Sequence, residues 1–129
     1  MATISEDYVS FEIAKLLKEK GFDQNCATYY LDGQVWRHYH GEVIPKGKQI
    51  YAAPTQAVAM KWLREKHNLF IQVTIVPHTT ITMEQKYYLF SIHKDRRRIA
   101  FRKDFSSECY STYEQACEAA IKYCLENLI

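Results

Sequence analysis

Two histidines separated by one residue form the clearest metal-ligand pattern of the chain, in His38-Tyr39-His40. On a strand, alternate side chains point to one face about 6.6 Å apart, which is close enough for two imidazoles to share one zinc ion. A third ligand would have to come from Cys26, His93 or a distant carboxylate, and no spacing supplies one. The alternative is a pair of surface imidazoles. His38 and His40 are therefore weak candidates, and the sequence predicts no metal and no cofactor.

The four cysteines do not form a catalytic set. Cys117 and Cys124 fall in a predicted helix about 10.5 Å apart along its axis, too far for a disulfide or a shared metal, and we expect both in the core. Cys109 lies in a predicted loop without a histidine implied as its partner. His78-x-Thr80 occurs once, and the chain contains no glycine-rich phosphate loop. We therefore expect a protein that is not an enzyme.

A short basic run provides the strongest signal for a polyanionic ligand. Arginines on a hairpin tip can contact phosphates with both arms of the guanidinium group, and Tyr87, Tyr88 or Phe101 could stack on bases. The alternative interpretation is a solvated tip whose charges prevent pairing at a strand edge. The run consists of Lys94, Arg96, Arg97, Arg98, Arg102 and Lys103, and a second patch is expected at Lys61, Arg64 and Lys66.

Aromatic residues favour a different partner. Ten of the 129 residues are tyrosine, and tyrosine and tryptophan dominate the energetic hot spots of protein interfaces. We expect Trp36, Tyr39 and Tyr51 to form an exposed protein contact. A non-enzymatic protein-binding role is the first prediction and nucleic-acid binding is the alternative. A homodimer is left open.

Composition and charge set the class of protein. The chain is 47% hydrophobic and 25% charged with a net charge of +2, which is typical of one folded domain over residues 1–129. We find no signal peptide at Met1–Glu6, and the longest apolar run, Leu69–Pro77, is too short to span a bilayer. No membrane partner is expected, and the expected location is the cytoplasm.

Three helices are predicted from caps and apolar stripes. The first spans Ser10–Lys20, with Ser10 as its N-cap and Gly21 after its end. The second begins at Pro54-Thr55 and ends near His67. The third begins at a capping box, Ser111-Thr112-Tyr113-Glu114.

Strands fill most of the remaining chain. Asp32-Gly33 predicts a two-residue hairpin turn between the first two strands. The stretch Gly41–Ala53 is expected to be an irregular connection. The predicted strands are Ala27–Leu31, Gln34–Tyr39, Leu69–Pro77, Lys86–His93 and Arg98–Lys103. The order α-β-β-α-β-β-β-α predicts an α+β fold with a largely antiparallel sheet and helices packed on it.

The two halves of the chain show a faint repeat. Tyr29-Tyr30 and Tyr87-Tyr88 each open a strand, and Thr55 and Thr112 each precede a helix, 57 to 58 positions apart. Each half therefore reads as a ββα unit that cannot bury its apolar face alone. The second half also has the α-β-β-β-α order of double-stranded-RNA-binding domains. That family places Lys-Lys-x-Ala-Lys at its final helix, whereas residues 111–116 here include an acid, so the similarity is one of topology only.

Three segments together resemble a group of small proteins encoded by gut bacteria and by their phages or prophages. The resemblance implies an accessory protein of a mobile element that acts inside a bacterial cell, and it carries over no activity and no functional residues. The segments are Val9–Phe22, Ala53–Gln56 running into Lys61–Glu65, and Thr112–Ala116 before the last helix.

Overall fold

The computed structural model describes residues 6–31, 33–36, 49–76, 87–101 and 110–129. Its helices begin at three side-chain caps, because Ser10, Thr55 and Thr112 each accept a hydrogen bond from a backbone N–H of the first turn. These bonds satisfy backbone donors that a helix leaves unpaired at its N-terminus. The helices are α1 (Phe11–Glu19), α2 (Gln56–His67) and α3 (Tyr113–Tyr123), and α3 continues into a π-helical turn, η1 (Cys124–Leu128).

The cap of α3 lies one residue later than predicted. The Thr112 hydroxyl accepts a hydrogen bond from the Gln115 N–H (3.1 Å), so Thr112 is the N-cap, not Ser111. The Gln115 side-chain carbonyl in turn accepts bonds from the Ser111 N–H (3.2 Å) and hydroxyl (2.8 Å). Gln115 therefore bonds back to Ser111, the residue before the N-cap, whereas in a capping box the third helical side chain bonds to the N–H of the N-cap itself.

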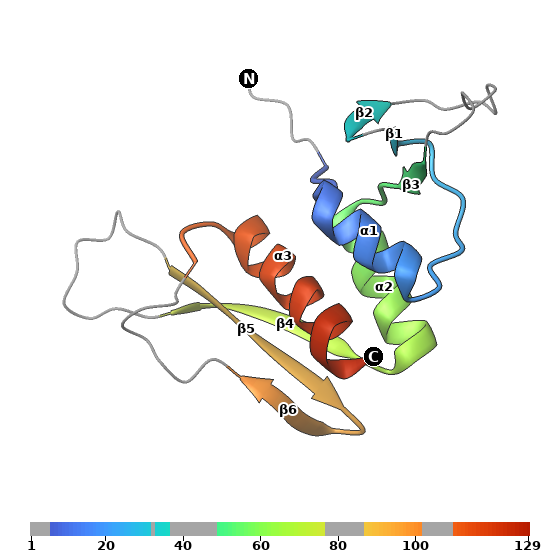
Figure 1. Cartoon of the computed structure of the whole chain (residues 1–129). Coiled ribbons are helices and arrows are strands. Elements are labelled where there is room, and N and C mark those ends of the chain that lie inside the picture. The colour runs from blue at the N-terminus through green and yellow to red at the C-terminus, as the bar shows by residue number, and fades with distance from the viewer. Residues whose placement is uncertain (1–5, 32, 37–48, 77–86, 102–109) are drawn as a thin grey trace.

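The strands form two separate three-stranded antiparallel sheets (Figure 1). The first sheet has the order β2-β1-β3, and the second is a simple meander in the order β4-β5-β6. The bounds are β1 (Tyr29–Leu31), β2 (Gln34–Trp36), β3 (Ile50–Ala52), β4 (Phe70–Val76), β5 (Tyr87–Lys94) and β6 (Arg97–Phe101).

This architecture confirms the predicted α+β class and the predicted order of elements, with one addition. The short strand β3 pairs with β1 inside the stretch that was expected to be irregular. Each half of the chain therefore contains three strands followed by a helix. The central strand is the first of the three in one half and the second in the other, so the two halves share an order of elements but not a sheet topology.

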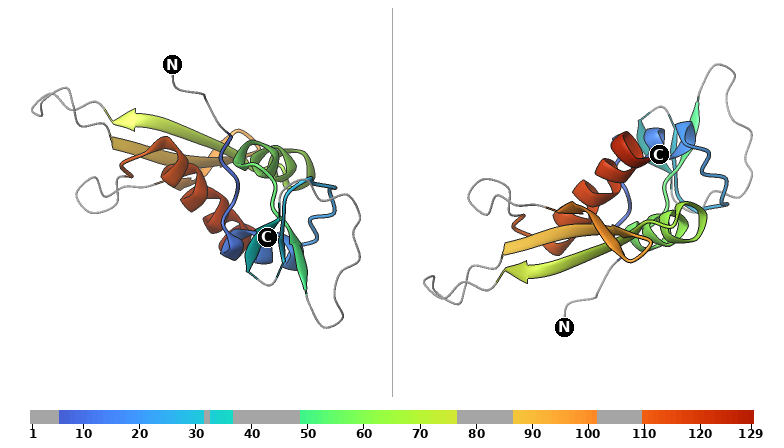
Figure 2. Two further views of the ribbon diagram at one scale, coloured as in Figure 1. Left: turned by 90° about the horizontal axis from the view of Figure 1, so that it is seen from above. Right: turned by 90° about the horizontal axis from the view of Figure 1, so that it is seen from below.

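One core joins both halves. Residues of α1, α2, β5, α3 and η1 belong to the same buried cluster, which includes Leu17, Leu63, Ile92 and Ile121. Burying each of these side chains contributes about 1.5–3 kcal/mol. α3 packs against β4 and β5 and also contacts α1 and α2. Figure 2 shows α3 covering one face of the second sheet, with α1 beyond it. Among the described residues, no helix covers the opposite face of that sheet.

Candidate functional site

The second sheet has one face against the helices and one face turned away from them. Ile71 and Val73 of β4 lie opposite Ile92 and Phe90 of β5, and all four pack in the core. Because successive side chains of a strand point to opposite faces, the residues between them belong to the other face. That face is the open face, and it is the part of the sheet that is able to meet a ligand.

A row of three side chains crosses the open face next to the hairpin of β5 and β6. Phe70 lies opposite His93, and His93 lies opposite Arg98. Phe70 is 44% exposed, which is unusual for a phenylalanine on a strand, and Arg98 is also exposed. The His93 Nε2 lies 3.1 Å from the Ser91 hydroxyl on the same face, which orients the imidazole. The row therefore presents a benzene ring, an oriented imidazole and a guanidinium group.

The open part of this face is limited to the half nearest the hairpin. Gln72 and Thr74 follow Phe70 on β4, and both are exposed. Leu89 lies on the same face farther along β5, but it is only 5% exposed. A ligand on the face would therefore lie over Phe70, Gln72 and His93 and extend toward the hairpin.

The hairpin turn between β5 and β6 holds two residues in the left-handed region. Lys94 and Arg97 lie opposite each other, and the two residues between them have positive φ angles, 52° for Asp95 and 67° for Arg96. Aspartate tolerates this conformation, whereas for arginine it costs about 1–2 kcal/mol. Glycine would be the usual residue at the second position. The turn therefore keeps a cation at its tip at a cost in stability.

A hydrogen bond fixes this turn to the end of α2. The Asn68 amide donates to the Asp95 carboxylate at 2.6 Å, and Asn68 is itself the left-handed C-cap of α2. The last turn of α2 carries Arg64 and Lys66, both exposed. This bond joins the end of α2, which carries part of the second predicted basic patch, to the turn of the basic hairpin, and Lys61, also exposed, lies one turn earlier on α2.

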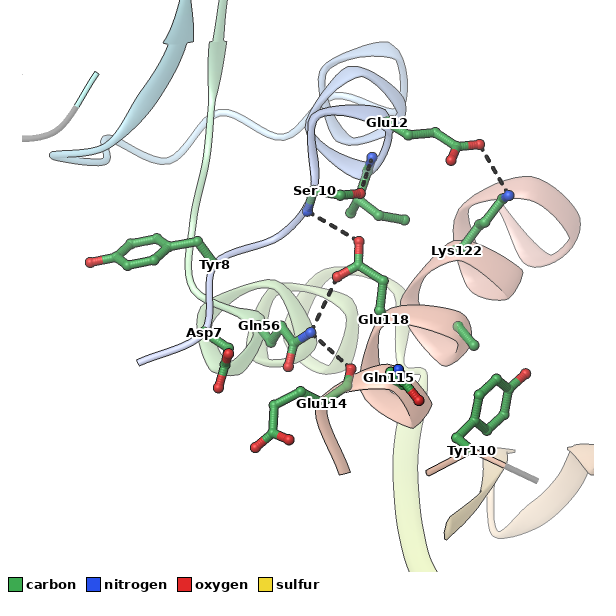
Figure 3. A pocket seen from close by; sticks show the side chains of 12 residues that line it. Asp7, Tyr8, Ser10, Glu12, Gln56, Tyr110, Glu114, Gln115, Glu118 and Lys122 are labelled. Carbon is green, nitrogen blue, oxygen red and sulfur yellow. Dashed lines mark hydrogen bonds and ion pairs between the residues drawn. The ribbon is translucent and has the colours of Figure 1, made fainter. Parts of the chain in front are cut away.

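A groove of the opposite charge lies where the N-termini of the three helices meet (Figure 3). Its volume is about 580 Å³. One basic residue lines it, Lys122, whose ammonium group forms an ion pair with Glu12 at 3.0 Å. The acidic residues of this acidic groove are Asp7, Glu12, Glu114 and Glu118.

Hydrogen bonds across the acidic groove connect the three helices. The Glu118 carboxylate accepts one bond from the Ser10 N–H (3.1 Å) and one from the Gln56 amide (3.2 Å). The same amide also donates to the Glu114 carbonyl at 3.0 Å, and Gln56 is only 7% exposed. Buried polar groups are stable only when they are paired, so Glu118 holds the junction together. Carboxylates at helix N-termini also offset the helix dipoles.

The buried cysteines are poor nucleophiles. Burial raises the pKa of the Cys124 thiol to about 12. Burial is also the main cause that raises the pKa of Cys117 to about 11, with further contributions from Glu114, Asp7 and Glu118. Both side chains lie in the core, as predicted. Cys109 lies outside the described residues.

The predicted protein contact is described only at Tyr51. The Tyr51 ring packs edge-on against Phe11 with the centroids 5.6 Å apart, and the Lys18 ammonium lies 4.8 Å from the centre of the same ring. The ring is therefore partly used within the chain. The side chain of Trp36 and the whole of Tyr39 lie outside the described residues, so this contact stays a prediction.

Other predicted site residues have mixed outcomes. His38, His40, Arg102 and Lys103 lie outside the described residues, and within the described ranges no three His, Cys, Asp or Glu side chains form a group that could hold a metal ion. Tyr88 contacts Tyr113 of α3 with the ring centroids 6.2 Å apart, and the suggestion that it stacks on bases stays a prediction.

The open-face residues Phe70 and His93 were missed as a site. The signal in the sequence was the alternation of apolar Ile71 and Val73 with polar Gln72 and Thr74, which marks the second face of β4 but not the apolar Phe70 on it. Such alternation indicates a strand with one face packed on the core and one face exposed to solvent.

Comparisons with known proteins leave the chain without a match. No protein-family model, no curated protein and no solved structure matches it. The resemblance to proteins of gut bacteria and their phages therefore stays a prediction. In the described part of the chain, every helix is too short or too polar to cross a membrane.

Proposed function

We propose that this protein binds nucleic acid through the β5–β6 hairpin. The observation that carries the proposal is the turn itself, which places Arg96 at its tip in a conformation that glycine would adopt at lower cost. Lys94 and Arg97 flank it, and all three side chains are exposed. Arginine contacts phosphate oxygens with two parallel N–H donors, so this tip matches the chemistry of a phosphate backbone.

Three cations, Lys94, Arg96 and Arg97, surround one acid at the hairpin turn. Asp95 is the acidic residue of the turn, and its carboxylate accepts the Asn68 hydrogen bond. Arg64 and Lys66 extend the positive surface onto α2. Exposed cations on two elements that the Asn68–Asp95 bond holds together support nucleic-acid binding over the alternative of a solvated tip.

The alternative of protein binding through Trp36, Tyr39 and Tyr51 has less support. Of these three, Tyr51 is the residue with a described side chain, and it packs against Phe11 and Lys18 of its own chain. No described feature of the first sheet favours a particular protein partner.

Fluorescence anisotropy tests the proposal. The protein is titrated into a labelled single-stranded oligonucleotide of mixed sequence at several salt concentrations. Binding should weaken with salt, with a slope of log K against log salt of about −0.7 for each phosphate contacted. The double variant Arg96→Ala/Arg97→Ala should bind about tenfold more weakly, with a slope about 1.4 less steep.

A matched control removes the same charge elsewhere. Lys15 and Lys18 are exposed on α1, so Lys15→Ala/Lys18→Ala has the same net charge as the hairpin variant. Its affinity should stay within about twofold of the unmodified protein, because phosphate contacts act locally. An equal loss in both variants, or no binding at low salt, would contradict the proposal.

A further inference from the structure

We infer that the nucleic acid is single-stranded and that its unpaired bases stack on the open face of the second sheet, over Phe70 and His93. The inference rests on the proposed function and extends it from the phosphates to the bases. It assigns a role to the exposed ring of Phe70, which contact with phosphate alone does not use.

The row on the open face has the chemistry of a stacking platform. Phe70, His93 and Arg98 occupy directly opposed positions on three adjacent strands. Adjacent strands lie about 4.8 Å apart, so the row is about 10 Å wide. Aromatic rings, imidazoles and guanidinium planes all stack on bases, and such stacking tolerates any sequence because every base has a flat face.

The platform is continuous with the basic hairpin. His93 is the residue before Lys94 in β5. Phe70 lies two residues after Asn68, whose amide is bonded to Asp95 of the turn. A strand that extends from Phe70 and His93 past the end of β5 would have its phosphates near Arg96 at the tip of the turn. Lys94 and its partner Arg97 alternate to the other face of the hairpin, so they can meet only phosphates that pass around the tip.

The exposed phenylalanine favours a single strand over a duplex. A two-stranded β-ribbon can also enter the major groove of a duplex, where arginines contact base edges. That mode would use the hairpin tip but would leave Phe70, on the flat face of the edge strand β4, without a base to stack on. Phe70 is 44% exposed on that face, and covering it with a base removes apolar surface from water.

Substitutions at Phe70 test the inference. Phe70→Ala and Phe70→Leu both remove the ring, and leucine keeps the apolar bulk, so we expect both to bind a single strand about 5- to 150-fold more weakly. Phe70→Trp should restore binding. The control is Ile75→Ala on the same strand, because Ile75 is 56% exposed but lies on the helix side of the sheet. Its affinity should change by less than twofold.

Two further measurements separate stacking from charge. The slope of log K against log salt should stay the same in Phe70→Ala, whereas it becomes less steep in Arg96→Ala/Arg97→Ala. A single strand with abasic residues throughout should bind Phe70→Ala and the unmodified protein equally, because it has no bases to stack. Thermal unfolding of each variant checks that it is folded.

The outcomes distinguish this inference from the proposed function. Salt-dependent binding that prefers a duplex of the same sequence, or that is unchanged in Phe70→Ala, would overturn the stacking inference and leave hairpin binding in place. Absence of binding to single strands, duplexes and abasic strands alike would overturn both. Weaker single-strand binding in Phe70→Leu that is restored in Phe70→Trp would support the inference.

Discussion

The basic hairpin and the acidic groove differ in what their charges contact. In the groove, both Glu118 oxygens accept hydrogen bonds from the chain, and Glu12 is paired with Lys122. At the hairpin, the acidic Asp95 is the group held by the chain, while Arg96 and Arg97 extend into solvent. Charged groups are therefore bound within the fold in one region, whereas in the other the arginines are left for a ligand.

The two regions also differ in their cost to the fold. Carboxylates at helix N-termini are favourable, and those of the acidic groove lie where α1, α2 and α3 begin. Lys94 and Arg97 are like charges directly opposite each other, and Arg96 adopts a left-handed conformation, both of which are unfavourable. A surface that reduces stability is the better candidate for function.

The largest expected effect on stability comes from Glu118→Ala. This change leaves the Ser10 N–H without its acceptor and removes one of the two acceptors of the buried Gln56 amide. We expect it to lower the free energy of unfolding by about 2–3 kcal/mol, measured by urea denaturation. Lys94→Ala is the control and should change it by less than about 0.5 kcal/mol. Equal losses would show that the two regions do not differ.

A substitution at the hairpin turn should raise stability, by less than Glu118→Ala lowers it. Arg96→Gly removes the strain of a left-handed arginine, so the free energy of unfolding should rise by about 1 kcal/mol and Tm by about 4 °C. The same change should weaken binding to single-stranded nucleic acid. Arg97→Gly is the control, because glycine in a strand should lower Tm. A fall in Tm for Arg96→Gly would remove the argument from strain.

Stability at alkaline pH tests whether burial raises the pKa values of the two core thiols. The pKa values of Cys117 and Cys124 are raised in the folded protein to about 11 and about 12, from 9.0 for a free thiol. Above pH 9 the unfolded thiols lose protons and the folded ones do not, so stability is full below pH 9 and falls as the pH rises toward 11. Thermal unfolding between pH 8 and 10.5 should show a steeper fall in Tm for the unmodified protein than for Cys117→Ala/Cys124→Ala. Parallel curves would contradict this account.

Neutralising part of the acidic groove should have the smallest effect, which is a change in affinity for nucleic acid. Asp7→Asn/Glu114→Gln removes two negative charges at exposed positions away from the hairpin. Affinity for a single strand should change by less than about twofold, and the change should be a gain, because long-range repulsion is screened by salt. A clear loss of affinity would place the nucleic acid in the groove.

Local signals in the sequence were sufficient for most elements of the fold. Adjacent residues identified Ser10 as a cap and Pro54-Thr55 as the start of a helix, and Asp32-Gly33 predicted the two-residue connection in which Leu31 pairs with Gln34. β3 was missed because three residues form a strand only through pairing with distant β1, as in Tyr30 opposite Tyr51. No local pattern specifies that contact.

The candidate surfaces depend on long-range register. The basic hairpin is contiguous in the sequence and was predicted. The row of Phe70 and His93 exists only because β4 and β5 pair in one register, and the Gln56–Glu118 bond joins residues 62 positions apart. Alternating exposure identifies the open face of β4 but does not identify its neighbours on β5.

Binding of a single strand at the hairpin and the open face is tested by titrating isotope-labelled protein with a single-stranded oligonucleotide and following the backbone amide signals in NMR spectra. The largest shifts are expected at Phe70, His93, Arg96 and Arg97, and no shift is expected at Gln56 and Glu118 in the acidic groove. Shifts concentrated in the acidic groove, or no shifts at all at low salt, would contradict binding at the hairpin and the open face.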